Sequence, residues 1–332
     1  MSDANKTPTK SLSMDDFRIM PVSGRPIPAG PLGARAAGAP QDPLGSLADL
    51  RDSTWRGAGF NQIWRPFDGL QSQPPQDFFL ELNETSEILQ FLEIPGDIPN
   101  RGLLQADITL HGLTYLQRIS DVNVLQEDGK PAGIHIEPGI WLRIPNTTNP
   151  QDPETVARLA NIPHGTSLVS QGTAAVGNTA PVFPPTSITP FTIAPPHTPI
   201  QFPATNLATP TNFRTLSTQI PNVTQAMIDN PNVFLANGVA NKTITRVTTL
   251  TISTIGLNPP SSGGGTSNIA FLQGTAGAAN AQGAQMDATF WIEEFVDEDG
   301  DTNFQLQYSQ RVLLNFNGLS WPHVSVATLS RD

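Results

Sequence analysis

The stretch Ile134-His-Ile-Glu-Pro-Gly-Ile-Trp-Leu-Arg-Ile144 decides the fold, because its side chains alternate in character from one residue to the next. The aliphatic residues occupy one set of alternate positions, and His135, Glu137 and Trp141 occupy the other. Successive side chains of a β-strand point to opposite faces of the sheet. The stretch therefore predicts an antiparallel strand with one face on the core and the other in solvent.

Apolar or β-branched runs of strand length continue on both sides of this stretch. The polar residues 83–86 predict a turn between two short strands, and His111-Gly112 predicts a break between two others. About ten strands with short connections predict an all-β fold, an antiparallel up-and-down β-barrel, which is wide enough to enclose a ligand. The further runs are 55–67, 78–82, 87–94, 103–110, 114–122, 155–162, 167–173, 243–253, 288–295, 304–316 and 321–330.

Two segments lack this alternation. Residues 1–41 are polar and then rich in proline, glycine and alanine, which predicts a flexible N-terminal tail. Residues 42–332 are predicted to form a single β-barrel domain, interrupted by a long proline-rich insert at about 176–240.

The insert differs in composition from a disordered linker. It carries nine prolines between Pro181 and Pro210, and Asp, Glu, Lys and Arg are absent from 159–213. Phenylalanines and isoleucines occur instead, so we expect an extended segment that packs on the domain or on a neighbouring subunit. Thr224 is expected to cap a short helix, and Pro231 to begin a second.

Composition excludes several classes of partner and site. The formal net charge is −11 and basic runs are absent, which argues against nucleic acid and anionic membranes as partners. Without cysteine, the chain forms neither disulfides nor thiolate sites. Neither the apolar core of a signal peptide nor a run of about 18 apolar residues occurs, so we expect a cytoplasmic protein without membrane contact.

Histidine is the remaining candidate for metal chemistry, because neutral imidazole is the commonest metal ligand and the usual proximal ligand of haem. The histidines lack the i, i+2 or i, i+4 spacing of a zinc site, but a single-histidine cofactor such as haem is compatible. His323 shares a strand face with the small residues Ser325 and Ala327, which leave room for a flat ligand. The five histidines are His111, His135, His164, His197 and His323.

Four segments resemble the nitrobindin family of haem-binding β-barrels, which are calycins similar to lipocalins. The resemblance covers roughly 45–175 and 243–332, and it leaves the tail and the insert unmatched. Ser53 and Asn61 stand where the family signature has its first and last glycines. The resembling segments are Trp55-Arg-Gly57-Ala-Gly59, His135-Ile-Glu137-Pro-Gly139, Ala160-Asn-Ile-Pro-His164-Gly-Thr and the terminal Trp321-Pro-His323 strand.

The resemblance implies ferric haem b whose iron is coordinated by His323. It also implies reactivity towards nitric oxide, peroxynitrite or peroxide, and an activity of the peroxynitrite isomerase or peroxidase type. His135 and His164 are candidates for an acid–base group on the distal side. The expected cofactor-binding residues are Trp55, Gly57, Gly59, His135, Glu137, His164, Ser325 and Ala327.

Two other functions use the same barrel. One is a lipocalin-like carrier of an apolar small molecule, such as a fatty acid, without metal. The other is a structural or assembly protein, in which the uncharged insert covers the barrel or holds a homo-oligomer together.

Overall fold

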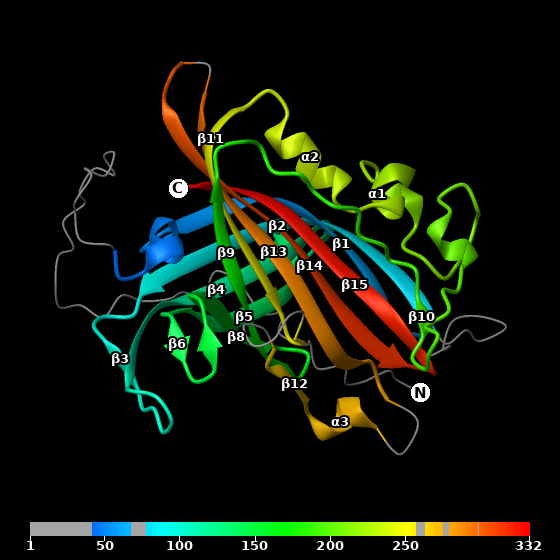
Figure 1. The fold of residues 1–332 in the computed structure, drawn as a ribbon. Coiled ribbons are helices and arrows are strands. Elements are labelled where there is room, and N and C mark those ends of the chain that lie inside the picture. Colours follow the sequence, from blue (N-terminus) through cyan, green and yellow to red (C-terminus); the bar gives the residue numbers. More distant parts are fainter. Residues whose placement is uncertain (1–41, 68–77, 257–262, 275–278, 298) are drawn as a thin grey trace.

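The computed structural model describes residues 42–67, 78–256, 263–274, 279–297 and 299–332, so the predicted tail lies outside the described residues. Ten long strands form a closed antiparallel barrel, in which each strand pairs with the next and β15 pairs with β1 (Figure 1). This confirms the up-and-down barrel. The barrel strands are β1 (Thr54–Pro66), β2 (Phe78–Glu93), β4 (Ile108–Leu125), β5 (Pro131–Ile144), β8 (Thr155–Ile162), β9 (Thr166–Gly177), β11 (Thr243–Ser253), β13 (Gln282–Val296), β14 (Thr302–Phe316) and β15 (Leu319–Arg331).

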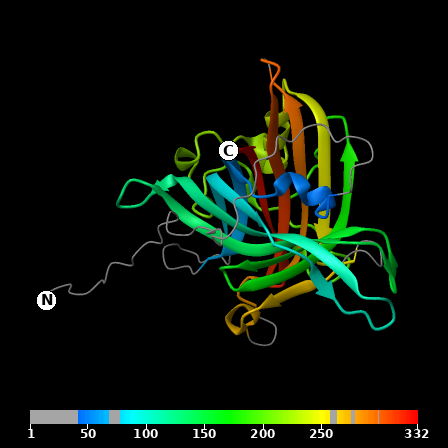
Figure 2. The ribbon, with the colours of Figure 1, turned by 90° about the vertical axis from the view of Figure 1, so that its left-hand side faces the viewer.

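Short elements decorate the barrel. Figure 2 shows that β2, β4, β5 and β8 run across the strands of the C-terminal half. The short strands are β3 (Ile98–Asn100), β6 (Thr147–Thr148), β7 (Gln151–Asp152), β10 (Phe191–Thr192) and β12 (Gly265–Asn268). The helices are η2 (Gly45–Leu50), η3 (Pro203–Thr205), η4 (Ser217–Gln219), α1 (Gln225–Asp229), α2 (Val233–Val239) and α3 (Ala270–Gln273).

Two predicted strand breaks are wrong. β2 and β4 each run without interruption through the polar residues that were expected to end a strand. At 83–86 the polar side chains have partners inside the sheet: the Asn83 amide donates to Asp121 at 2.8 Å, and Thr85 Oγ1 donates to Glu87 at 3.0 Å. His111 pairs in register with Arg143 of β5. A polar run therefore continues a strand when neighbouring strands satisfy its side chains.

The prediction for the two faces of β5 is wrong, because the face with His135, Glu137 and Trp141 is the more buried one and the aliphatic face is the more exposed one. Glu137 is fully buried and Trp141 is buried, whereas Ile136 and Ile140 on the other face are partly exposed. The polar face therefore points into the barrel, where Arg158 of the neighbouring strand β8 and Tyr115 of the neighbouring strand β4 lie beside it. The barrel interior thus contains a layer of polar side chains that includes Glu137, Arg158 and Tyr115, which we call the polar layer.

One end of the barrel is closed by apolar packing. The helix η2 places Leu47 and Leu50 against Trp55, at the start of β1, and against Leu329, near the end of β15. This core extends along the interior past Phe290 and Tyr308 to Met286 and Val312. It leaves the opposite end of the barrel, where β1 ends and β15 begins, for the polar layer and a cavity.

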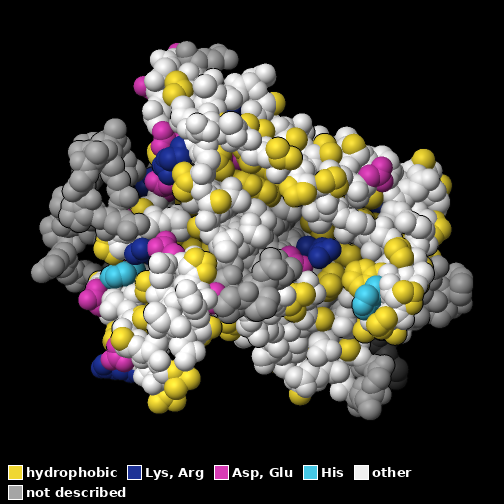
Figure 3. All heavy atoms as spheres, viewed as in Figure 1, with side chains coloured by type: hydrophobic (Ala, Val, Ile, Leu, Met, Phe, Trp, Pro, Cys, Tyr) yellow, Lys and Arg dark blue, Asp and Glu magenta, His cyan; other side chains and the backbone are white. Residues whose placement is uncertain are grey.

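The insert packs against the outside of the barrel and forms a second core there. Its residues Ile188, Ile220 and Leu235 are buried against a barrel face that includes Trp64 and Trp321. The Trp64 indole donates to the Ile188 carbonyl oxygen at 2.8 Å. Figure 1 shows α1 and α2 lying along this side, and Figure 3 shows few charged side chains on this face.

The two predicted helices of the insert are present. Thr224 caps α1 by accepting a hydrogen bond from the Met227 N–H at 3.3 Å, and α2 follows after Pro231. The insert therefore covers the barrel, which was one of the two arrangements expected from its composition.

Candidate functional site

A half-enclosed cavity of about 280 Å³ lies at the end of the barrel away from η2. Its wall combines aliphatic side chains such as Ile63, Ile119 and Val312 with polar ones, and Leu272 of α3 contributes at the mouth. Pockets that bind small molecules are mostly apolar with a few convergent polar groups. The polar lining residues include Asn61, Gln117, His135, His164, Tyr308, Gln310, His323 and Ser325.

Four of the residues expected at the site line this cavity, and five do not. His135, His164, His323 and Ser325 belong to its wall. Glu137 lies directly behind His135, with its Oε2 atom 3.3 Å from the ring. The residues that lie deeper in the barrel, outside the cavity wall, are Trp55, Gly57, Gly59 and Ala327.

The deeper residues have identifiable packing roles. The Trp55 indole donates to Ser53 Oγ at 2.8 Å, within the apolar core beside η2. A Cβ atom added at Gly59 would lie 2.5 Å from Glu87 Oε1 and 2.6 Å from Thr85 Oγ1. Gly59 is therefore required because the Glu87 carboxyl group occupies the space that a side chain would fill.

His323 presents a neutral imidazole to the cavity. It extends from β15 with a partly exposed ring, and its Nε2 atom lies 3.3 Å from Ser325 Oγ. Burial, reinforced by nearby His135 and His164, lowers the pKa of His323 to about 3. A neutral ring has an unprotonated nitrogen, which is the form that coordinates a metal.

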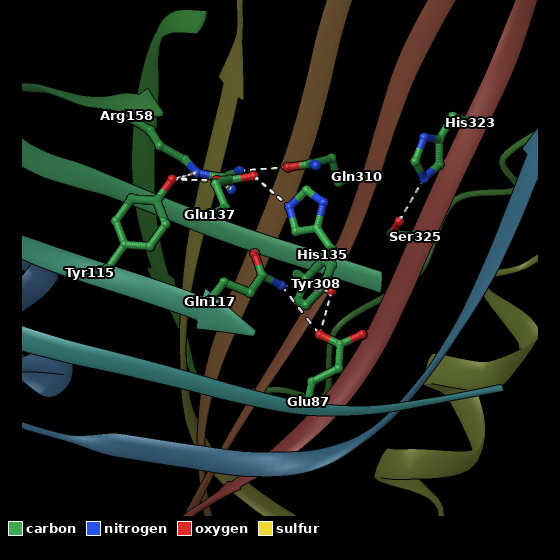
Figure 4. Close-up of polar contacts among 10 residues, drawn as sticks. All are labelled: Glu87, Tyr115, Gln117, His135, Glu137, Arg158, Tyr308, Gln310, His323 and Ser325. Atoms are coloured by element: carbon green, nitrogen blue, oxygen red, sulfur yellow. Dashed lines mark hydrogen bonds and ion pairs between the residues drawn. The ribbon is translucent and has the colours of Figure 1, made fainter. Parts of the chain in front are cut away.

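A buried ion pair supports His135 (Figure 4). Arg158 forms a salt bridge with Glu137 inside the barrel, and the Tyr115 hydroxyl also donates to Glu137. The Arg158 Nε–H donates to the Tyr115 oxygen at 2.8 Å. Burial alone would raise the pKa of Glu137, but the Arg158 charge and the His135 and Tyr115 hydrogen bonds bring it down to about 2. Glu137 is therefore an anion at neutral pH.

A second carboxyl group lies beneath the cavity, and none of the described Lys and Arg residues forms an ion pair with it. The Tyr308 hydroxyl donates to Glu87 Oε2 at 2.6 Å, and the Gln117 amide donates to the same oxygen at 3.2 Å. Burial raises the pKa of Glu87, although these hydrogen bonds and the one from Thr85 oppose the rise. Two carboxyl groups of the same polar layer thus have opposite pKa shifts, as in sites that separate acid and base roles.

Asn61 was not identified as a site residue from the sequence. It is 3% exposed and lines the cavity, in register with Ser325 on the adjacent strand. Its Oδ1 atom is buried, and no hydrogen-bond partner for it occurs among the described residues. Such an atom carries a desolvation penalty until a donor reaches it, so a ligand N–H or O–H group at this wall would be favoured.

Several candidate residues lie away from the cavity. His197 is in the insert. His111 is on β4, and its Nε2 atom lies 3.9 Å from Asp97 Oδ1. Among the described residues, three or more His, Asp or Glu side chains do not gather at any point into a group that could hold a metal ion. Over the same ranges, every helix is too short or too polar to cross a membrane.

The comparisons with known proteins found no relative. No protein-family model matches the chain, and neither a curated protein sequence nor a solved structure matches it at a significant level. The resemblance to nitrobindin therefore stays a prediction that depends on the quoted motifs.

Proposed function

We propose that the barrel binds a small molecule in the histidine-lined cavity, and that this ligand is haem b coordinated by His323. The observation that carries the proposal is the position of the His323 imidazole on the wall of a half-enclosed cavity. Burial lowers the pKa of His323 to about 3, which favours the neutral ring. Haem proteins use one proximal histidine and set ligand access through the distal pocket. Haem coordination by one histidine does not need the cluster of three protein ligands that a zinc site has.

The residues present fit one end of a haem group. Ile63 of β1 and Val312 of β14 both pair in register with His323, and they would provide apolar contact for a flat macrocycle. The volume of about 280 Å³ is just below the roughly 300–1,000 Å³ of pockets that enclose drug-sized ligands. A porphyrin would therefore fill the cavity and extend beyond it. Arg65 and Glu81, which form an ion pair at 2.6 Å, also belong to the cavity wall.

Haem bound there would supply an iron centre that takes a diatomic molecule or a peroxide at its remaining position. The chain itself contributes the imidazole of His323, the apolar wall and the polar layer below. We include in this proposal that the haem-loaded protein would act as a peroxynitrite isomerase or as a peroxidase.

The test is titration of the purified protein with hemin, followed by the Soret absorption. We expect saturable binding by the wild type and a loss of more than about tenfold in affinity, about 1.4 kcal/mol, for His323→Ala. His111→Ala is the matched control, because it removes a histidine far from the cavity. Equal affinity of His323→Ala and wild type would show that His323 is not the ligand.

A carrier of an apolar small molecule without metal is the second candidate, and the modest cavity volume favours it. Native mass spectrometry of the protein as expressed separates the two functions. A mass increase that matches a fatty acid, together with no Soret band after hemin addition, would favour the carrier.

A further inference from the structure

His135 and His323 lie on opposite sides of the cavity. In the closed strand order, β1, β2 and β4 separate β5 from β15 on one side, and five strands separate them on the other. Both rings line the same cavity, and Figure 4 shows them extending from separate strands. A flat molecule that contacts His323 with one face would therefore present its other face to the wall that carries His135.

His135 is held in one tautomer by its carboxylate partner. Glu137 is ionised and can only accept hydrogen bonds, so the Nε2 atom of His135, which lies 3.3 Å from Glu137 Oε2, must carry the hydrogen. The second ring nitrogen, Nδ1, is then unprotonated. The His135 side chain is 14% exposed and lines the cavity.

Glu137 is itself fixed in position. It is fully buried, and Arg158 and Tyr115 bind its Oε1 atom while His135 contacts Oε2. Both oxygens are therefore occupied by partners from three different strands. This matches the role of the aspartate in serine hydrolases, which orients a histidine and stabilises its charged form without taking the proton.

We propose that His135 is the general base of the cavity, and that Glu137 is its positioning residue. The substrate class is a small protic molecule H–X, such as a peroxide, bound between the His135 wall and a flat ligand held by His323. The H–X bond breaks, its electron pair stays on X, and the proton moves to Nδ1 of His135. The Glu137 carboxylate, which binds Arg158 through Oε1, then stabilises the imidazolium through Oε2. This inference rests on the proposed function, because the flat ligand defines where H–X binds.

The tautomer of His135 tests the dyad without any ligand. Protein carrying ¹⁵N-labelled histidine is studied by NMR in the absence of hemin, and we expect His135 in the Nε2–H form. Glu137→Gln should abolish this preference, because an amide can either donate or accept. An Nδ1–H tautomer in the wild-type protein overturns the proposal, whatever the outcome with hemin.

Cyanide association tests the base in the hemin-loaded protein, because hydrogen cyanide is protonated at neutral pH and must lose its proton to bind as an anion. We expect His135→Gln, which keeps polarity but lacks a basic nitrogen, to slow association about 100-fold, as general bases contribute 10²–10⁴. His135→Ala should act alike, and His111→Ala should match the wild type.

The outcomes separate the two proposals. If hemin binds and His135→Gln takes up cyanide as fast as the wild type, the base assignment is wrong and haem binding stands. A slowing by His164→Ala, with none by His135→Gln, also overturns the assignment. If hemin does not bind the wild-type protein, the proposed function and this inference fail together.

Discussion

Glu293 gives the sharpest test of how the insert is attached to the barrel. This residue of β13 is fully buried on the outer face, beneath α2. Gln305 donates to its Oε2 atom and also to the Gly238 carbonyl oxygen, at 3.2 Å, near the end of α2. The Oε1 atom has no hydrogen-bond partner within the part of the chain that the structure describes. Burial raises the pKa of Glu293 to about 7, although Gln305 and the Lys242 charge oppose the rise.

The raised pKa of Glu293 determines whether the free energy of unfolding rises or falls with pH. The folded protein holds the Glu293 proton more tightly than the unfolded chain, whose value is the ordinary 4.5. The contribution to stability is therefore fully present below about pH 4.5 and is lost as the pH rises through about 7. A shift from 4.5 to about 7 corresponds to about 3 kcal/mol, of which about 1 kcal/mol or less is already lost at pH 5.

The variant Glu293→Gln imitates the protonated acid at every pH. We expect it to exceed the wild type in free energy of unfolding by about 2–3 kcal/mol at pH 8, and by about 1 kcal/mol or less at pH 5. Urea unfolding, followed by tryptophan fluorescence at both pH values, measures this difference. The matched control is Glu294→Gln, which removes a partly exposed ion pair with Arg246 and should destabilise by less than about 1 kcal/mol at pH 8.

A gain that is the same at pH 5 and pH 8 would refute the argument, because a pH-independent gain comes from packing and not from the charge of Glu293. A variant less stable than the wild type at pH 8 would also refute it. In that case a cation or hydrogen-bond donor stabilises the carboxylate by more than its burial costs.

Three further predictions concern the cavity and the two cores. Asn61→Leu should raise the free energy of unfolding by about 1–2 kcal/mol, measured by urea unfolding, because it removes a buried oxygen without a partner. Trp64→Phe should cost about 1–3 kcal/mol by leaving the Ile188 carbonyl oxygen unpaired, and hemin titration should be unchanged. Arg158→Met should cost about 3–5 kcal/mol in thermal or urea unfolding, because it leaves the charge of Glu137 buried and unpaired.

The sequence predicts the barrel because its strands alternate and its turns are short. It also places His323 and Ser325 correctly on one inward face, since that depends only on strand geometry. The two false breaks in β2 and β4 have a common cause. Polar residues such as Thr85 indicate a turn when they are considered locally, but Glu87 and Gln117 supply partners inside the barrel.

The polar layer was missed because it is assembled from distant positions. Arg158 and Tyr115 lie on strands that the sequence indicated, yet alternation along one strand does not reveal which charged side chain of a neighbouring strand lies beside it. The one available signal was the polar face of the His135–Arg143 stretch, whose burial was assigned to the wrong side. Asn61 gave a weaker signal, as a polar residue where the resembling family has glycine.

The polar layer is better explained by function than by stability. A buried ion pair such as Arg158–Glu137 contributes little net stability compared with apolar residues of the same volume, because both charges lose their hydration. Glu87 is buried without a cation, which adds a further cost. Apolar side chains extend along the barrel from η2 past Phe290 to Met286 and Val312, so the fold has apolar packing at the same level and did not require polar side chains there. The layer lies directly beneath the cavity and fixes His135 there, and ionisable groups with shifted pKa values tend to cluster at functional sites.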